Sequence, residues 1–152
     1  MPHAVPELIP APAPAAPPEP PPRRRWPLRL LRASAVLVLL DTLVQAALAG
    51  LFVTGDLDLL AWHAANAAVL GALTVVQTAA AVLVWRLLRG PGWPAAASAL
   101  LVVLVSVQQG LGEARVLAGH MPLGMAVFGC ATALTCWAHT YRPTAHVAGG
   151  AR

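Results

Sequence analysis

Four long apolar runs, separated by short breaks, restrict how this chain of 152 residues can fold more than any other feature. The runs cover about residues 33–54, 60–88, 95–117 and 120–141. As a helix, each run is long enough to cross a hydrocarbon core about 30 Å thick. The chain is 58% hydrophobic and 11% charged, a composition that excludes an ordinary soluble domain of this length. The sequence therefore predicts four transmembrane helices.

The breaks between the runs contain residues that end helices. Gly55 follows the first run, and the segment 89–94 combines two glycines with two prolines. Because short connections make sequential helices antiparallel, we expect an all-α, up-down-up-down four-helix bundle in the membrane. This transmembrane domain is predicted to cover residues 28–142.

The two ends of the chain differ from the apolar part. Residues 1–27 hold eleven of the fifteen prolines and almost no large apolar residue. Such a segment cannot bury a core, so the sequence predicts a disordered, Pro- and Arg-rich cytoplasmic tail. A passive tail is favoured over a proline motif that binds a partner domain. Residues 143–152 are predicted to form a second disordered tail.

The N-terminal tail lacks the order typical of a signal peptide, in which arginines precede an apolar segment. We therefore expect the membrane part to be retained whole.

The distribution of arginine predicts the orientation in the membrane. Nine of the ten arginines fall on segments expected on one side, and only Arg115 lies on the other. Because positively charged loops stay inside, both termini are predicted to be cytoplasmic in a multi-pass protein of a bacterial-type plasma membrane. The lipid bilayer is its first expected partner. The arginines do not form one binding face, so the net charge of +4 is not taken as a sign of a nucleic-acid partner.

Two histidines are predicted to lie at matched depth near the outer face. His63 precedes Arg86 by almost the same interval in sequence as His120 precedes Arg142. At a helical rise of about 1.5 Å per residue, these separations are about 34 Å and 33 Å. Ionisable side chains in such positions are candidates for function, and neutral imidazole binds metals and haem iron. The pair thus predicts a metal or haem clamp; the alternative is two solvated, uninvolved side chains at the interface.

Several residues around the histidines fit such a site. Ala67, Gly71 and Gly124 lie one or two turns further along the two helices, near the same face. Their small side chains would leave room for a flat macrocycle, or would equally allow close helix packing. Arg115 could bind a carboxylate such as a haem propionate through paired hydrogen bonds, or be a solvated charge at the rim.

Polar residues also interrupt the apolar runs at mid-depth. Asp41 and Gln77 are each separated by the same interval from an arginine, Arg32 and Arg86, or about 13 Å along the helix. We therefore expect them to be able to hydrogen-bond across the first hairpin. For these two residues, a hydrogen bond that holds the helices together is favoured over a role in proton transfer.

A short internal repeat relates the two halves of the domain. Residues 44–48 read Val-Gln-Ala-Ala-Leu, and residues 107–111 read Val-Gln-Gln-Gly-Leu. Each segment precedes a histidine: Gln45 is followed by His63 and, at a shorter interval, Gln108 by His120. The repeat predicts two related hairpins around an axis along the membrane normal, and ligand sites favour such repeat interfaces.

These segments carry a family resemblance. Residues 45–55 look like the end of the first helix in haem A synthases, and Gln108–Gly112 followed by His120–Gly124 is similar to that family's Q-x-x-L-G…H-L segment. The chain resembles one four-helix half of such a protein over residues 33–141. The resemblance implies one b-type haem near the outer face, with His63 and His120 as its axial ligands.

The chain departs from the family at the position that matters for catalysis. The family carries a glutamate one turn before the helix-2 histidine, where this chain has Leu59, and the external loop lacks the family's cysteine pair. Oxidation of a haem methyl group is therefore not expected. The resemblance implies a haem-binding, cytochrome-like protein that works with a redox partner or a second copy of itself. The alternative is a cofactor-free four-helix membrane protein, a structural or interaction subunit in which the histidines are incidental.

Overall fold

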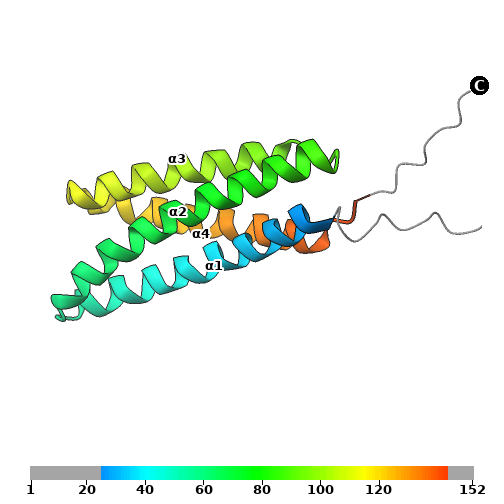
Figure 1. Cartoon of the computed structure of the whole chain (residues 1–152). Helices are drawn as coiled ribbons and strands as arrows, with labels where there is room; N and C mark the ends of the chain where they lie inside the picture. The colour runs from blue at the N-terminus through cyan, green and yellow to red at the C-terminus, as the bar shows by residue number, and fades with distance from the viewer. Residues whose placement is uncertain (1–24, 144–152) are drawn as a thin grey trace, which may run out of the picture.

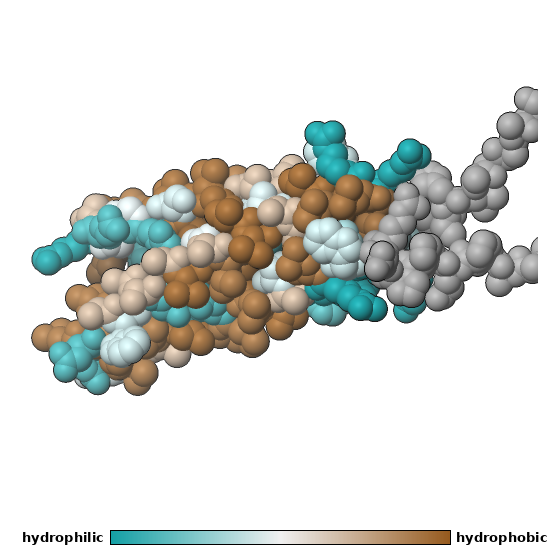
Figure 2. Space-filling view, viewed as in Figure 1, coloured by the Kyte–Doolittle hydropathy of each residue, from teal (hydrophilic) through white to brown (hydrophobic). Residues whose placement is uncertain are grey.

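A computed structural model of the chain describes residues 25–143 and shows an all-helical protein (Figure 1). Its helices are α1 (Trp26–Val53), α2 (Asp58–Leu87), α3 (Trp93–Glu113) and α4 (Leu117–Thr140). All four are long and apolar enough to cross a membrane, which confirms the four predicted helices. Figure 2 shows apolar residues over most of the face in view and polar residues gathered mainly at the two ends of the bundle. The predictions for the tails fall mainly on 1–24 and 144–152, outside the described residues.

Helix α1 begins earlier than the apolar run suggested. Trp26 and Pro27, assigned from the sequence to the tail, form its first turn, and Pro27 is buried. Proline is well suited to this position because its fixed φ matches the helix and its missing N–H has no helical partner there. Arg29 and Arg32 are therefore part of α1 rather than residues that precede it.

Helix α3 ends at Glu113, before the predicted position 117, because the backbone turns at Arg115. Arg115 has a φ of 58°, in the left-handed region that commonly ends helices. The N–H of Val116 bonds to the carbonyl of Leu111 at 2.8 Å, and the N–H of Arg115 bonds to the carbonyl of Gly112 at 3.0 Å. This pair of hydrogen bonds is a Schellman motif, and it lets α4 begin at Leu117 instead of His120.

The helices form a ring in which each packs on two neighbours. Helix α1 contacts α2 and α4, and α3 contacts the same two helices. The α1–α2 and α3–α4 connections lie at one end of the bundle, here called the turn end (Figure 1). The α2–α3 connection and the two ends of the described chain lie at the other, here called the terminal end.

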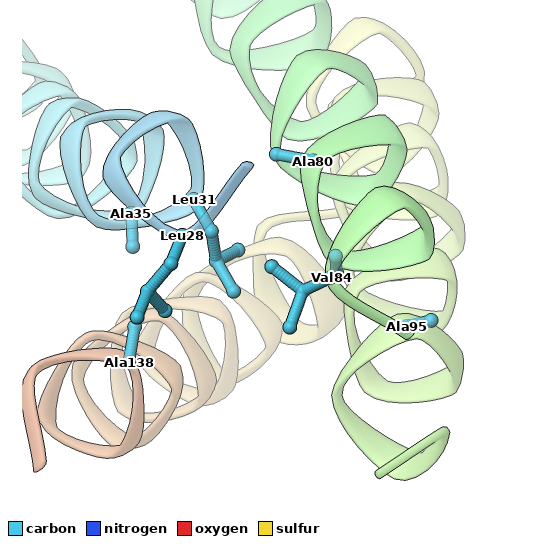
Figure 3. Packing of buried hydrophobic residues seen from close by; sticks show 8 residues of the cluster. Leu28, Leu31, Ala35, Ala80, Val84, Ala95 and Ala138 are labelled. Carbon is cyan, nitrogen blue, oxygen red and sulfur yellow. The ribbon is translucent and has the colours of Figure 1, made fainter. Parts of the chain in front are cut away.

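The terminal end is closed by a cluster of small and aliphatic side chains (Figure 3). Its buried members come from all four helices: Leu28, Leu31, Ala35, Ala80, Ala81, Val84, Ala95 and Ala138. Arg32 joins α1 to the last turn of α4, because its Nε donates to the carbonyl of Ala138 at 2.9 Å and its Nη2 donates to that of Tyr141 at 3.0 Å. Carbonyls at a helix C-terminus have no helical partners, so these bonds satisfy them.

Toward the turn end, α1 and α4 no longer bury residues against each other. A second cluster fills the middle of the bundle, with Val38, Leu70, Leu101, Val105, Val127, Ala131 and Leu134. Beyond it, the last buried residue of α1 is Gln45 and the first of α4 is Val127. In Figure 1 the pair α1–α2 stands apart from the pair α3–α4 at this end. The bundle is therefore tight at the terminal end and open between α1 and α4 at the turn end.

The expected contact between Asp41 and Gln77 does not form. Asp41 instead meets Asn66 of α2, and the Gln77 side chain donates to Ser98 Oγ of α3 at 3.4 Å. The depth estimate was wrong because Arg32 lies inside α1, whereas Arg86 is near the end of α2, so the two arginines are not level. Gln77 is buried, and its Oε1 has no hydrogen-bond partner. It links α2 to α3, not to α1.

Candidate functional site: a histidine pair beside an apolar pocket

His63 and His120 lie next to each other at the turn end of the bundle. They come from the first two turns of α2 and the first turn of α4, helices that lie diagonally across the ring. The ring centroids are 6.3 Å apart, and the ring planes cross at 68°. The structure thus brings together the two side chains that the sequence placed at matched depth.

Each imidazole is held by the backbone of the preceding helix. Nδ1 of His63 lies 3.2 Å from the carbonyl oxygen of Gln45, and Nδ1 of His120 lies 2.7 Å from that of Gln108. Because a carbonyl oxygen only accepts hydrogen bonds, each Nδ1 carries the proton, and each Nε2 is unprotonated and able to accept a hydrogen bond or bind a metal. A bond of this kind is the usual support of a metal-binding histidine.

The two histidines belong to two copies of the same small unit. The side-chain Nε2 of Gln45 lies 3.3 Å from Nε2 of His63, and that of Gln108 lies 3.4 Å from Nε2 of His120. The sequence repeat included these glutamines without assigning them to the site. The longer interval from glutamine to histidine in the first hairpin is accommodated by longer ends of α1 and α2 beyond the site. The unit in each hairpin is hereafter called the Gln–His unit.

Only the first Gln–His unit carries additional polar residues. Nδ2 of Asn66 donates to Oε1 of Gln45 at 2.8 Å and lies 3.4 Å from Oδ2 of Asp41. At the corresponding positions of the second repeat, the chain has Leu104 and Leu123. Asn66 was not predicted as a site residue, although a lone amide shortly after His63 in an apolar run is the kind of signal that marks function in membranes.

A cavity of about 640 Å³ lies beside the histidine pair, between α1 and α4. Its lining is mostly apolar and includes small residues of both helices: Ala46, Ala49, Gly50 and Gly124. Its polar groups come from His63, His120, Gln45, Gln108 and Thr42. The volume falls within the range of about 300–1,000 Å³ that is typical of small-molecule and cofactor sites.

The pocket opens on the side of the bundle. Val53 of α1 and Met125 of α4 line it, and their side chains are 73% and 75% exposed. Met121 and Phe128 of α4 also line the pocket and are exposed. A ligand therefore has an apolar route through the gap between α1 and α4.

The other predicted site residues lie in different places. Gly124 lines the pocket, and a Cβ there would come within 3.3 Å of the Gln108 amide nitrogen. Ala67 and Gly71 face α3 instead: the Ala67 carbonyl accepts a bond from Gln109 at 2.5 Å, and a Cβ on Gly71 would lie 3.7 Å from the same amide. Arg115 is exposed in the α3–α4 connection and does not line the pocket. Roles for Ala67, Gly71 and Arg115 in cofactor binding stay predictions.

Gly112 sets the position of the second histidine. A Cβ on this residue would lie 2.9 Å from both Cε1 and Nδ1 of His120. No real Cβ atom approaches a ring so closely, so the imidazole can pack here only against glycine. The sequence analysis included Gly112 in the family-like segment but not in the site.

Comparison of the chain with known protein families, with curated proteins and with solved structures finds no match. Over residues 25–143, no group of three or more His, Cys, Asp or Glu side chains lies together in a way that could hold a metal ion. The groups that could hold a ligand at this site are the two imidazoles and the pocket beside them.

Proposed function

We propose that this chain is a multi-pass membrane protein that binds one b-type haem between His63 and His120 and transfers electrons. In this proposal it is inserted up-down-up-down in a bacterial-type plasma membrane, with both termini in the cytoplasm and the haem near the outer face. The observation that carries the proposal is the adjacent pair of imidazoles, 6.3 Å apart between ring centroids, beside an apolar pocket.

The separation of the rings suits one metal atom between them. Metal–imidazole nitrogen distances of about 2.0 Å on each side of a metal would put the two ring centroids about 6 Å apart. The porphyrin supplies the other ligands of a haem iron, so the protein needs to provide only axial side chains. Two histidines are one such axial set.

The surroundings of the pair fit a flat, apolar ligand. The backbone carbonyls of Gln45 and Gln108 hold each Nδ1–H, so that each Nε2 is unprotonated, and a metal would replace the glutamine amide as its partner. Ala49, Gly50 and Gly124 leave space beside the rings, and the apolar lining excludes water. These residues bind, orient and shield; they do not themselves react.

Electron transfer is favoured over oxygen chemistry. A haem with two histidine ligands supplies one-electron chemistry and leaves no open position on the iron for a substrate. Leu59, half-buried in the first turn of α2, offers no carboxylate at the position where haem A synthases carry a glutamate. The residues of the site therefore support a carrier of electrons and not an oxidase of the haem itself.

One observation favours a second candidate, a cofactor-free structural or interaction subunit. Each histidine already has two contacts within its own hairpin, one to a glutamine carbonyl and one to the same glutamine's side-chain amide. Imidazoles with these contacts hold α1 to α2 and α3 to α4 without any ligand. The two candidates differ in whether the pocket binds a porphyrin.

A haem titration separates them. The full chain, purified without haem and placed in lipid nanodiscs, is titrated with haemin while its visible spectrum is recorded. We expect the Soret band to sharpen and shift until one haem per chain is bound and then to stop changing. A spectrum that matches haemin added to empty nanodiscs at every ratio would contradict the proposal and favour the structural subunit.

A further inference from the structure

The two Gln–His units differ in one respect that the proposed haem site does not require. In the first unit, the Asn66 amide connects Gln45 to the carboxyl group of Asp41. Its Nδ2 lies 2.8 Å from Oε1 of Gln45 and 3.4 Å from Oδ2 of Asp41. The second unit builds the same Gln108–His120 contacts with leucines at both corresponding positions. The polar pair Asp41–Asn66 is therefore not needed to form a Gln–His unit.

Asn66 connects Asp41 to the first Gln–His unit through hydrogen bonds. Helix α1 packs against α2 and α4, whose titratable side chains at the turn end are Asp58, His63 and His120. Asp58 is exposed at the start of α2. On α1 itself, the nearest basic residue in sequence is Arg32, which lies toward the terminal end and bonds to carbonyls of α4. The carboxyl group of Asp41 meets an amide instead, and Asp41 is only partly buried.

An ionised carboxylate in a membrane span is costly, and so is any change of charge beside it. A one-electron change at the histidine pair alters the net charge of the site by one unit. A proton that binds to Asp41 as the electron arrives would keep the net charge constant. Asn66 donates both to the Asp41 carboxyl group and to Oε1 of Gln45, and so connects the carboxyl group to this unit.

We propose that Asp41 is a proton-binding residue whose protonation is coupled to electron transfer at the His63–His120 pair. This inference rests on the proposed haem function. As an external one-electron donor delivers an electron to the site, the Asp41 carboxylate takes one proton from water and becomes a neutral carboxylic acid. When the electron leaves, the O–H bond breaks and the proton returns to water, so charge and atoms balance in both directions.

The test is the midpoint potential of the haem-loaded chain as a function of pH. A negative carboxylate favours the oxidised site, so the wild-type potential should fall as pH rises, by up to about 59 mV per unit for one proton per electron. Asp41→Asn, which stays neutral, should have a higher midpoint potential with little pH dependence.

Two further variants test the geometry. Asn66→Leu, which copies the second repeat, should weaken the pH dependence of the midpoint potential. Asp56→Asn, an exposed carboxyl at the turn end, is the control and should keep the wild-type slope.

An equal slope in the wild type and Asp41→Asn would overturn the coupling while leaving haem binding intact. Infrared spectroscopy of the haem-free chain gives an independent reading. We expect a protonated-carboxyl band that titrates with pH and is missing in Asp41→Asn but present in Asp56→Asn. An unchanged band in Asp41→Asn would overturn the role of Asp41 as a proton-binding residue. A chain that binds no haem overturns the proposed function and the coupling together, and the infrared band still decides whether Asp41 exchanges protons.

Discussion

Replacing either His63 or His120 by alanine is expected to abolish stable haem binding. Each histidine supplies one of the two axial ligands in the proposed site, and their rings are 6.3 Å apart between centroids. Loss of a residue that only supports a metal ligand costs about 10–100-fold in affinity, so loss of a ligand itself should cost about 100-fold or more. The measurement is the haemin titration in nanodiscs, run on the wild type and on both variants.

His139→Ala is the matched control for these variants. His139 is exposed in the last turn of α4, and its Nδ1 bonds only to the Thr135 carbonyl one turn before. The His139→Ala variant should bind haem with the affinity of the wild type. Wild-type affinity in both His63→Ala and His120→Ala would contradict the proposed site, whereas a helical circular dichroism spectrum shared by all the variants would exclude misfolding as the cause of any loss.

Gly112→Ala is expected to weaken haem binding by about 10–100-fold, the usual effect of displacing the support of a metal ligand. The new Cβ would lie 2.9 Å from two ring atoms of His120, so the ring must move. Its movement would disturb the 2.7 Å contact between Nδ1 and the Gln108 carbonyl. The dissociation constant from the haemin titration measures the effect.

Gly110→Ala makes the same substitution slightly earlier in α3 and is the control. A Cβ on Gly110 meets nothing within 4 Å, so His120 should stay in place. Alanine is a better helix former than glycine, and this variant should be more stable by about 0.5–1 kcal/mol with unchanged haem affinity. Equal affinities in Gly110→Ala and Gly112→Ala would show that the close approach of Gly112 does not position the histidine.

The helices could be predicted from the sequence because an apolar run of sufficient length has few other folds. The ends of the helices could not be predicted, since a hydropathy pattern places a helix end wherever an arginine interrupts the apolar run. Pro27 instead starts α1 before its arginines, and the left-handed backbone of Arg115 ends α3 within a segment that is still largely apolar. Local backbone geometry decided both boundaries.

The histidine pair could also be predicted, because the rise per residue of a helix is constant. The number of residues between a histidine and the arginine at the other end of its helix therefore gives the depth of the histidine in the membrane. The same reasoning failed for Asp41 and Gln77, since the arginines used as reference marks are not level. Gly124 was predicted to leave room for a ligand and lines the pocket, but the shape and the opening of the pocket could not be predicted. It exists because α1 and α4 separate beyond Gln45 and Val127, and no sequence pattern reports the angle at which two apolar helices pack.

The electron paramagnetic resonance spectrum of the ferric, haem-loaded chain tests the central claim most directly. If His63 and His120 both bind the iron, all of the haem should be low-spin and six-coordinate, with the signal of two axial imidazoles. In His63→Ala and His120→Ala, any haem that still binds should become high-spin. A wild-type spectrum dominated by high-spin iron would contradict the claim that the two histidines hold one haem between them.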